Sequence, residues 1–492
     1  LAFADDLALV SRTPRGLQSN LNRLSESLRL SGLIVSAGTG GKSASMRIDI
    51  DGRAKKHIVN PSAYLSVDGE NVPAISITKT YKYLGIQVGA HGTRAEVKEK
   101  LVAGLANLTR APLKPFQRLH ILRVQLMPSL THQLVLAGVT KGYLKDLDRL
   151  VRAASRSWLK LPHDTPNAFL HANYKDGGLS IDSLSLTIPF LKGKRFGKLT
   201  VSSDDTVLAA TETNSFKRMH KKWREAQVKE GALMNSKAAI RRGFAAQLHG
   251  TLDGAGLRSM PQSGHIQRWI TDPCPPCNGR NFTGRVKVRA NALLTKTRAS
   301  RGRNGVDVRC DCCGRPESLG HILQVCARCH GKRVARHDKI VQKMRERASK
   351  AGFEVRVEPR IRGESGTLVP DIVMVKGRKA YVLDPTIVAD NADLDDQVNA
   401  KQTKYSVGSV RKWIRSEFKN QDLEVVAKGL VLNWRGAMAA ESYALLTQEL
   451  KFGLSFCRML VSIVLEESFY MYTHFMQSTF RCSQATRARN AR

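Results

Sequence analysis

The chain of 492 residues is short of acidic residues and of long apolar runs. It holds 42 Asp and Glu against 79 Lys and Arg, which gives a formal net charge of +37. A field of that sign favours a polyanionic partner, and nucleic acid is the first candidate. The most apolar late stretch, residues 452–472, is interrupted by Arg458, Glu466 and Glu467. It is therefore not a bilayer span, and we expect no membrane partner.

Cysteines are also few, and all nine lie at or after Cys274. No secretory signal sequence precedes them, so we expect free thiols in a reducing compartment rather than disulfides. The length suits about three domains. Because the chain opens at Leu1 inside an apolar run, we expect the N-terminal part of the same protein to be missing.

Four of the late residues form the pattern C-x2-C-x7-H-x4-C: Cys310, Cys313, His321 and Cys326. Three thiolates and one imidazole close a tetrahedral structural zinc site without an open position, which argues against a zinc hydrolase. The clustering of cysteines favours metal binding over coincidence, although Cys312 and Cys329 lie nearby. So small a segment has no core of its own, and we expect its folding to depend on zinc.

A second cysteine pair, Cys274 and Cys277, has two interpretations. The segment C-P-P-C could supply another pair of zinc ligands, or it could be a loop without such a role.

Residues 1–10 (LAFADDLALV) suit a tight β-hairpin with Asp5 and Asp6 at its tip. Adjacent carboxylates repel each other unless a divalent cation lies beside them, and magnesium is the natural cation. An acidic turn in a solvated hairpin is the alternative, but the apolar flanks favour burial. Residues 36–43 (SAGTGGKS) are not a nucleotide-binding loop, because Ser36 stands where that motif needs Gly.

The most informative local pattern lies between residues 369 and 384. Two apolar strands are joined through Gly377-Arg378, and a two-residue loop with Gly first suits a type II′ hairpin. That register places Asp371 opposite Asp384, with Cβ atoms about 5 Å apart on one face. Both faces are otherwise apolar, so the strands should be central and buried. Two carboxylates there would repel each other unless they hold a cation, and magnesium fits hard oxygen ligands.

Residues 393–405 read as a helix with Leu394, Val398, Lys401 and Tyr405 along one stripe. Lys401 would thus lie on the inward face, where a lysine is costly without an anionic partner. Its long stem could alternatively carry the amine to water at the rim. Lys404 lies at the flank of the stripe. An inward lysine near two metal-bound carboxylates suits phosphodiester hydrolysis.

Two basic runs flank the zinc motif, at residues 280–306 and 332–350, with eight Lys or Arg in each. A charge run is usually a solvated face, but two runs around a zinc site favour phosphate contacts. The candidate nucleic-acid-binding residues are Arg285, Lys287, Arg289, Arg298, Arg301, Arg303, Arg336 and His337.

Several further short motifs follow one another along the chain. They are Phe3-Ala4-Asp5-Asp6, Gly32-Leu33 with Lys42, Tyr83-Leu84-Gly85, residues 161–166 (LPHDTP), residues 176–179 (DGGL) and Arg336-His337-Asp338. Together with the zinc spacing, Pro370-Asp371, Asp384 and Lys401/Lys404, they resemble the C-terminal portion of non-LTR retrotransposon polyproteins that carry a restriction-like endonuclease. This is the lineage that inserts into ribosomal RNA genes, and the resemblance spans essentially the whole chain.

The resemblance implies a multidomain α+β fold: a partial reverse-transcriptase palm, a helical thumb, a zinc knuckle and a small α/β restriction-like nuclease domain. The expected boundaries are residues 1–92 for the palm, 93–270 for the thumb and connector, 271–350 for the basic linker with the knuckle, 351–440 for the nuclease and 441–492 for a helical tail. Its expected cofactors are structural Zn²⁺ and catalytic Mg²⁺. Its expected partners are a DNA target and an RNA template, and its expected location is the nucleus.

The resemblance also implies residue roles. Asp5 and Asp6 would belong to the polymerase catalytic hairpin, and Lys42, Tyr83, Leu84 and Gly85 would contact nucleic acid. The related nucleases carry a lysine two residues after the second acid, where this chain has Thr386. The helix would supply the lysine instead, and the choice between Lys401 and Lys404 stays open.

Two functions follow from these observations. The first is a metal-dependent DNA endonuclease that nicks target DNA to prime reverse transcription, attached to part of an RNA-directed DNA polymerase. That polymerase needs another metal-binding Asp before Leu1, so we do not expect the chain to polymerise alone. The second is a nucleic-acid-binding remnant that depends on zinc and basic patches and has no catalytic activity.

Overall fold

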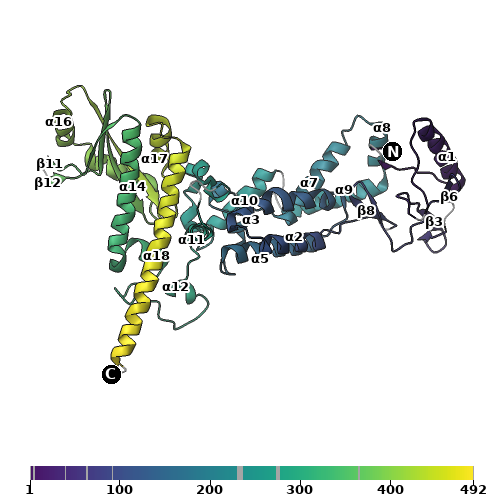
Figure 1. The fold of residues 1–492 in the computed structure, drawn as a ribbon, viewed down its shortest axis with the longest axis horizontal. Helices are drawn as coiled ribbons and strands as arrows, with labels where there is room; N and C mark the ends of the chain where they lie inside the picture. Colours follow the sequence, from purple (N-terminus) through teal and green to yellow (C-terminus); the bar gives the residue numbers. More distant parts are fainter. Residues whose placement is uncertain are drawn as a thin grey trace. The chain divides into compact units, whose positions relative to one another are not determined.

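The structure is a computed structural model, and it describes the chain apart from residues 1, 4, 5, 39, 63, 64, 91, 230–235, 273–276, 364, 365, 491 and 492. The side chains of residues 2, 3, 57, 226–229 and 480–490 are also outside the description. The chain packs into two compact units, each drawn in Figure 1. The first comprises Leu1–Asn107, Val124–Leu150 and Leu184–Lys229, and the second comprises Leu108–Arg123, Val151–Ser183 and Glu230–Arg492. The five consecutive domains expected above stay a prediction.

The first unit begins with small antiparallel pairs of strands around one helix. The pairs are β1 (Ala2–Phe3) with β2 (Asp6–Leu7), β3 (Arg47–Asp51) with β4 (Lys56–Asn60) and β5 (Ser66–Val67) with β6 (Glu70–Asn71), while β7 (Tyr81–Tyr83), β8 (Ile86–Gly89) and β9 (Gly92–Arg94) form a sheet. Helix α1 (Pro14–Leu30) starts at Thr13, whose side chain accepts a hydrogen bond from the Gly16 amide. Leu21 of α1 packs with Leu65, Val67 and Val72 in a small core.

Helices make up the middle of the chain. They are α2 (Lys98–Arg110), α3 (Pro115–Ile121), η1 (Leu122–Leu126), α4 (Met127–Leu136), α5 (Lys141–Leu159), α6 (Asn167–His171), η2 (Tyr174–Asp176), α7 (Leu184–Leu199), α8 (Asp205–Thr211), α9 (Asn214–Lys229) and α10 (Lys237–His249). Their apolar faces are buried: Leu101 of α2 and Leu147 of α5, for example, have no exposed surface. None of the helices in the described part of the chain is long and apolar enough to cross a membrane.

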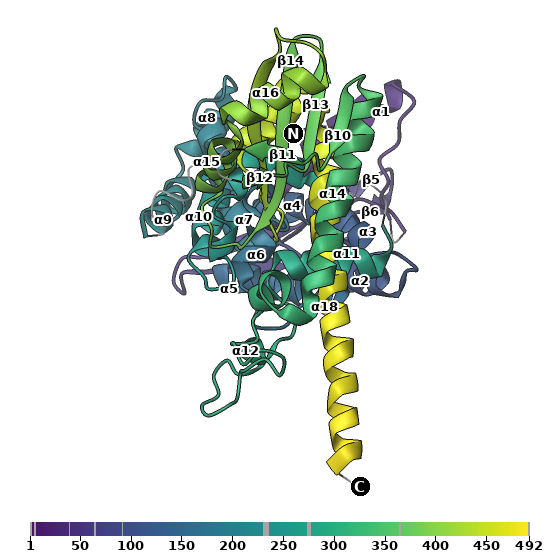
Figure 2. The same cartoon turned by 90° about the vertical axis from the view of Figure 1, so that its left-hand side faces the viewer.

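The second unit continues with short helices that lead into the zinc motif. They are η4 (Ala255–Leu257), η5 (Met260–Ile270), α11 (Gly279–Arg289), α12 (Lys296–Ala299), α13 (Leu319–Gln324) and η6 (Ala327–Cys329). The long helix α14 (His330–Lys350) follows, and α17 (Ala440–Ala444), η7 (Leu445–Glu449) and the long α18 (Leu454–Asn490) end the unit. Helix α18 packs against α11, α13 and α14, and Figures 1 and 2 show α14 and α18 side by side.

A four-stranded mixed sheet lies in the second unit, in the order β10 (Glu354–Val357), β13 (Ile372–Lys376), β14 (Lys379–Val388), β15 (Glu424–Asn433). Strands β10, β13 and β14 are antiparallel neighbours, and β15 runs parallel to β14. Helices α15 (Leu394–Tyr405) and α16 (Gly408–Glu417) form the crossover between β14 and β15. A separate hairpin pairs β11 (Ile361–Gly363) with β12 (Gly366–Leu368).

Helices α15 and α16 form a hydrophobic core with the central strands of this sheet. Val373 and Val382 are paired across β13 and β14, and they pack with Tyr405, Val410 and Ile414 of α15 and α16. Helix α14 also packs against β10, β13 and β14, and Figures 1 and 2 show the sheet between α14 and α16. The mixed helix and sheet content confirms the expected α+β class.

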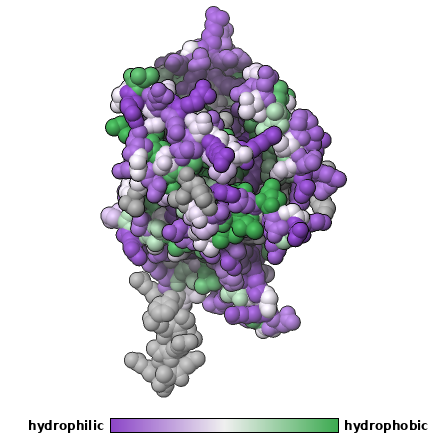
Figure 3. Space-filling view, turned by 90° about the vertical axis from the view of Figure 1, so that its right-hand side faces the viewer, coloured by the Kyte–Doolittle hydropathy of each residue, from purple (hydrophilic) through white to green (hydrophobic). Residues whose placement is uncertain are grey.

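Figure 3 shows a face on which hydrophilic side chains predominate and apolar ones form small, scattered patches.

Candidate functional site

The register of the β13–β14 hairpin agrees with the sequence prediction. Lys376 pairs with Lys379 and Ile372 pairs with Leu383, so Gly377-Arg378 is a two-residue loop. Gly377 has φ +60° while Arg378 is not among the residues with positive φ, as a type II′ turn requires. Both strands are central in the sheet. Asp371, which directly precedes β13, and Asp384 therefore continue the face on which Val373 and Val382 lie.

Asp384 is the more enclosed carboxylate, with 8% of its side chain exposed. Lys401 Nζ lies 3.0 Å from Asp384 Oδ1, and the Tyr405 hydroxyl donates to Oδ2 at 2.9 Å. The Thr386 hydroxyl donates to Oδ1 at 3.0 Å. Burial raises the pKa of Asp384, but Lys401 and the two hydroxyls outweigh burial, so the pKa is lowered and the group is ionised at neutral pH.

Helix α15 delivers Lys401 and Tyr405 because its start and its packing are fixed. Asp393 caps the helix, with its side chain accepting from the amides of Asp395 and Asp396. The helix then packs closely on β15 at Gly429, where a Cβ atom would lie 3.1 Å from the Val398 Cα. Lys401 and Tyr405 are one helical turn apart, so both reach the same carboxylate.

Lys401 and Lys404 differ in geometry. The side chain of Lys401 is 24% exposed and pairs with Asp384, as expected for an inward lysine. Lys404 is exposed, and its Nζ lies 4.7 Å from the centroid of the Tyr405 ring. Both side chains line the same cleft. The ion pair therefore favours Lys401 over Lys404 as the lysine of this site.

Asp371 is held by a residue from α14. His337 Nε2 lies 3.1 Å from Asp371 Oδ2, and His337 Nδ1 lies 3.3 Å from Asp338 Oδ1. The hydrogen bond with Asp371 raises the pKa of His337 to about 9, against the opposing effect of burial, so the ring is an imidazolium at neutral pH. Burial and the neighbouring charge of Asp384 raise the pKa of Asp371, although His337 opposes them.

These groups line a half-open cleft of about 400 Å³. Its other lining residues are Gln324, Arg333, Arg336, Val369, Pro385 and Ile387. Mg²⁺ is usually bound by one or two carboxylates and completes its octahedron with water and substrate phosphates. Asp371 and Asp384, on adjacent strands in an accessible cleft, fit that requirement.

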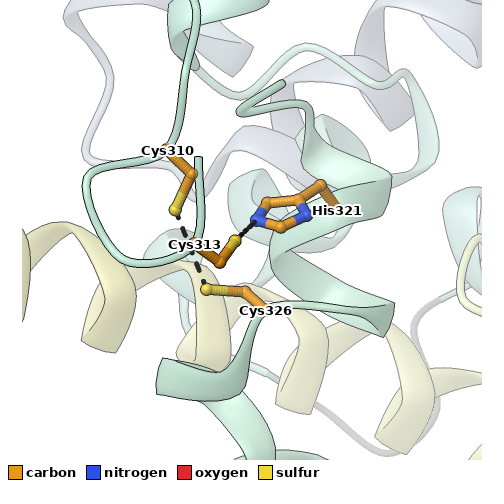
Figure 4. A group of neighbouring side chains, drawn as sticks. All are labelled: Cys310, Cys313, His321 and Cys326. Carbon is orange, nitrogen blue, oxygen red and sulfur yellow. Dashed lines mark hydrogen bonds between the residues drawn. The ribbon is translucent and has the colours of Figure 1, made fainter. Parts of the chain in front are cut away.

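The four residues of the zinc motif converge, as Figure 4 shows. Their ligand atoms all lie within 4.8 Å of one another. Cys310 Sγ is 3.9 Å from Cys326 Sγ, and Cys313 Sγ is 3.3 Å from His321 Nε2. A tetrahedral Zn²⁺ with Zn–S bonds of about 2.3 Å places two sulfurs about 3.8 Å apart. The cluster therefore fits zinc in both donor chemistry and spacing.

Local structure explains why these four residues meet. A tight turn brings the amides of Cys313 and Gly314 to the Cys310 carbonyl, and Gly314 takes the required positive φ of 70°. His321 lies in the first turn of α13, which Ser318 caps. Burial raises the pKa of the Cys326 thiol to about 12, so its thiolate form needs a cation beside it.

The neighbouring cysteines lie outside this set. Cys312 is exposed and Cys329 is buried, and neither belongs to the cluster. Cys274 lies outside the described residues, so its expected pairing with Cys277 is not tested; Cys277 itself is buried.

Four candidate phosphate-binding arginines instead stabilise the second unit. Arg285 forms an ion pair with Glu466, and Arg298 pairs with Asp253 and Asp164. Arg289 donates to the carbonyl of Arg435 and to Gln267, while Arg336 donates to Ser468 and to the Leu323 carbonyl. All four are buried and have partners within the second unit, so their contact with phosphates stays a prediction.

The other members of the basic runs differ from one another. Arg301 forms ion pairs with Asp253 and Asp164 and is partly exposed. Lys287 is half-buried, and Arg303 is exposed. Lys287, Arg301 and Arg303 thus remain predicted nucleic-acid contacts.

The N-terminal acidic hairpin is described only in part. Strands β1 and β2 form the expected hairpin, but Phe3 pairs with Asp6, so Asp6 lies in β2 rather than at the tip; Asp5 lies outside the described residues. Asp6 is exposed, so the expected burial is wrong for that residue. The Lys42 carbonyl accepts a hydrogen bond from Tyr81.

The turn at Tyr83-Leu84-Gly85 is rigidly held. Leu84 and Gly85 form a two-residue loop with φ of 47° and 78°, the pattern of a type I′ turn. His132 and Gln133 of α4 bond the carbonyls of Leu84 and Gly85 at 3.1 and 2.9 Å.

Comparison with known proteins places the chain among mobile elements. No family model matches it. It is 35% identical over 447 residues to the Retrovirus-related Pol polyprotein from type-2 retrotransposable element R2DM of Drosophila melanogaster, covering 90% of this chain and 41% of that protein. A corresponding type-1 R2 protein of Popillia japonica is 30% identical over 493 residues, covering 99% of each chain. The chain belongs to the family of R2 retrotransposon Pol polyproteins.

The expected family resemblance is thereby confirmed. The R2 protein of Nasonia vitripennis is 32% identical over 448 residues, which is 91% of this chain and 42% of that protein. The chain thus spans about two fifths of the Drosophila and Nasonia relatives.

Sequence reasoning missed several residues of this R2 cleft. Tyr405 and Thr386 bond Asp384, and His337 bonds Asp371 rather than standing as a free basic residue. Tyr405 could have been found, because it follows Lys401 by one turn on the predicted stripe. His337 could not, since 34 residues separate it from Asp371.

Proposed function

We propose that this R2 chain carries a metal-dependent DNA endonuclease that nicks target DNA, so that the exposed 3′-hydroxyl primes reverse transcription. One observation carries the proposal. Asp371, directly before β13, and Asp384 on the neighbouring strand β14 both line the half-open cleft, with Lys401 Nζ 3.0 Å from Asp384. Two carboxylates and a lysine in this arrangement suit phosphodiester hydrolysis.

Each residue of the cleft has a separate role in the proposed reaction. Mg²⁺, when bound, lowers the pKa of water and neutralises charge on the phosphate. Asp371 and Asp384 would hold that ion, while Tyr405 and Thr386 fix the orientation of Asp384. The Lys401 ammonium faces the site and stabilises the charge that develops on the phosphate oxygens. Water adds to phosphorus, the P–O3′ bond breaks, and the 3′-oxygen takes a proton.

His337 prepares the other carboxylate. Its imidazolium holds Asp371 Oδ2 at 3.1 Å and so would fix the orientation of the carboxylate that holds the ion. This partner comes from α14, directly after the zinc knuckle, so the site draws on both segments.

We assign the first residues of the chain to the polymerase of the same polyprotein. Asp5, Asp6, Lys42 and the turn Tyr83-Leu84-Gly85 would serve catalysis and nucleic-acid contact there, with an RNA template as substrate and the nucleus as location. The names of the relatives support this assignment, since each is a Pol polyprotein.

The test uses supercoiled plasmid that carries a ribosomal RNA gene, incubated with the chain and Mg²⁺. We expect conversion to the nicked form, and we expect Asp371→Asn to abolish it. Asp422→Asn is the matched control, because Asp422 is exposed and outside the cleft. Nicking that survives Asp371→Asn would contradict the site.

A nucleic-acid-binding remnant is the second candidate, and the net charge of +37 supports it. Salt-sensitive DNA binding that is unaffected by Asp371→Asn, without cleavage by the unaltered chain in any divalent metal, would favour that function instead.

A further inference from the structure

One residue both lines the nuclease cleft and contacts the zinc knuckle. Arg333, in the first turns of α14, lines the cleft together with Asp371 and Asp384. Its Nη1 donates at 2.7 Å to the carbonyl of Cys326, one of the four zinc-motif residues. One guanidinium therefore contacts the backbone of the knuckle and borders the acid pair.

Two other cleft residues make similar connections. Gln324, at the end of α13, donates to the Val388 carbonyl at the end of β14, at 2.8 Å. Arg336 donates to the Leu323 carbonyl and to Gln324 Oε1. The segment between His321 and Cys326 is thus bonded to the end of β14 and to α14 by side chains that line the cleft.

The cations of the cleft are not equivalent. His337 and Lys401 are paired with the two acids, and Arg336 is buried. Arg333 is only half-buried, and in the described part of the chain it forms no ion pair. A guanidinium has five N–H donors in a planar fork, and the bond to Cys326 uses one of them. The hydrogen bond to Cys326 therefore positions the Arg333 guanidinium, and its remaining N–H donors and its positive charge can bind an anion.

We propose that Arg333 binds a backbone phosphate of the DNA strand in the nuclease cleft, and that the zinc knuckle is the part of the nuclease that positions it. The inference rests on the proposed endonuclease function. It assigns the knuckle a role inside the cleft: zinc ligation by Cys326 and His321 fixes the carbonyl on which Arg333 is aligned. Loss of zinc would free that carbonyl and release the guanidinium from its place.

The first experiment measures binding without cleavage. In an Asp371→Asn background, the affinity for the plasmid-derived duplex is measured across salt concentrations. We expect Arg333→Ala to weaken binding about tenfold and to lower the slope of log K against log salt by about one, as loss of one phosphate contact requires. Arg333→Lys should keep the slope. Arg378→Ala is the matched control, because Arg378 is exposed and lies outside the cleft and outside both basic runs.

An unchanged slope in Arg333→Ala would overturn the phosphate contact. If the unaltered chain does not nick DNA but the slope still falls, the contact stands and the proposed catalytic function fails. In a chain that nicks, we expect Arg333→Ala to raise KM about tenfold and to change kcat less than threefold.

The second experiment tests the knuckle by amide hydrogen exchange and a double-mutant cycle. We expect Cys310→Ser to increase exchange in residues 319–337 and at the end of β14, whereas Cys312→Ser should leave both unchanged. We also expect Arg333→Ala to add little to the DNA-binding loss of Cys310→Ser, because both remove the same contact. Increased exchange confined to residues 310–318, or fully additive losses, would overturn the role of the knuckle.

Discussion

Replacement of Lys401 by methionine separates the two lysines that the sequence left open. Methionine keeps most of the unbranched stem, which packs beside Gly429, and removes the ammonium that lies 3.0 Å from Asp384. Tyr405 and Thr386 still donate to Asp384, so the carboxylate keeps two partners. The variant should therefore fold and lose mainly the positive charge of the site.

The expected size of the effect follows from the positions of the two ammonium groups. Removal of one preorganised donor that stabilises developing charge costs about 10²–10³-fold in rate. Lys401 meets this description, being 24% exposed and paired with an almost buried acid. Lys404 is exposed, and the charge of an exposed lysine contributes at most about 1 kcal/mol, or about fivefold. We thus expect Lys401→Met to be at least about twentyfold slower than Lys404→Met.

The assay is single-turnover nicking of the supercoiled plasmid at saturating Mg²⁺ and protein. Single turnover isolates the chemical step from product release. Far-UV circular dichroism and thermal unfolding of each variant check that the fold is kept. A matched DNA-binding measurement shows whether the loss lies in binding or in the chemical step.

Two results would refute this reasoning. Equal losses in Lys401→Met and Lys404→Met would mean that the ion pair with Asp384 does not mark the functional lysine. A larger loss in Lys404→Met would assign the role to the exposed lysine, and the ion pair of Lys401 would then be structural.

Three further predictions concern pH and stability. The pKa of His337 is raised to about 9 in the folded state, so its pairing with Asp371 stabilises the fold fully below about pH 6.5. This stabilisation is lost as pH rises through about 9, and we expect it to be about 1 kcal/mol after solvent screening. When unfolding is measured without Mg²⁺, the stability of His337→Asn should lack this pH dependence. Arg435→Met should lower the free energy of unfolding in urea by about 3–5 kcal/mol, because Arg435 is buried and donates to two carbonyls and a carboxylate. As a control, Arg303→Ala should change the free energy of unfolding by less than about 0.5 kcal/mol, because Arg303 is exposed. Tyr405→Phe should shift the acid limb of the nicking pH profile upward, because its hydroxyl lowers the pKa of the carboxylate that it bonds; an unchanged limb would contradict this.

Local patterns were enough for the acid pair and for the knuckle. The Gly377-Arg378 loop and strict alternation in two short strands fix which residues face each other, so Asp371 and Asp384 could be paired without a fold. The helix that carries Lys401 follows from its apolar spacing and its Asp393 cap. Zinc ligands within seventeen residues can be read from their spacing alone, because the turn between them is short.

Charge runs were less informative, because the partners of their arginines come from distant parts of the chain. Arg285 meets Glu466 across 181 residues, and Arg336 meets Ser468 across 132 residues. A short segment of sequence shows the charge of a side chain. The free-energy cost of burying that charge depends on partners from other parts of the chain. The sequence therefore assigned these arginines to phosphates, whereas in the structure each also has a partner within the protein.

The sequence by itself determined the elements of the site: two opposed acids, a helix with an inward lysine and a compact ligand cluster for zinc. Each of these depends on spacing over fewer than twenty residues, which backbone geometry translates directly into proximity. Only the tertiary structure decided that Lys401 rather than Lys404 meets Asp384, that His337 holds Asp371, and that Arg333 joins the knuckle to the cleft. These contacts join different helices, strands and loops of the second unit, and the packing of these elements sets which polar atoms come within hydrogen-bond distance.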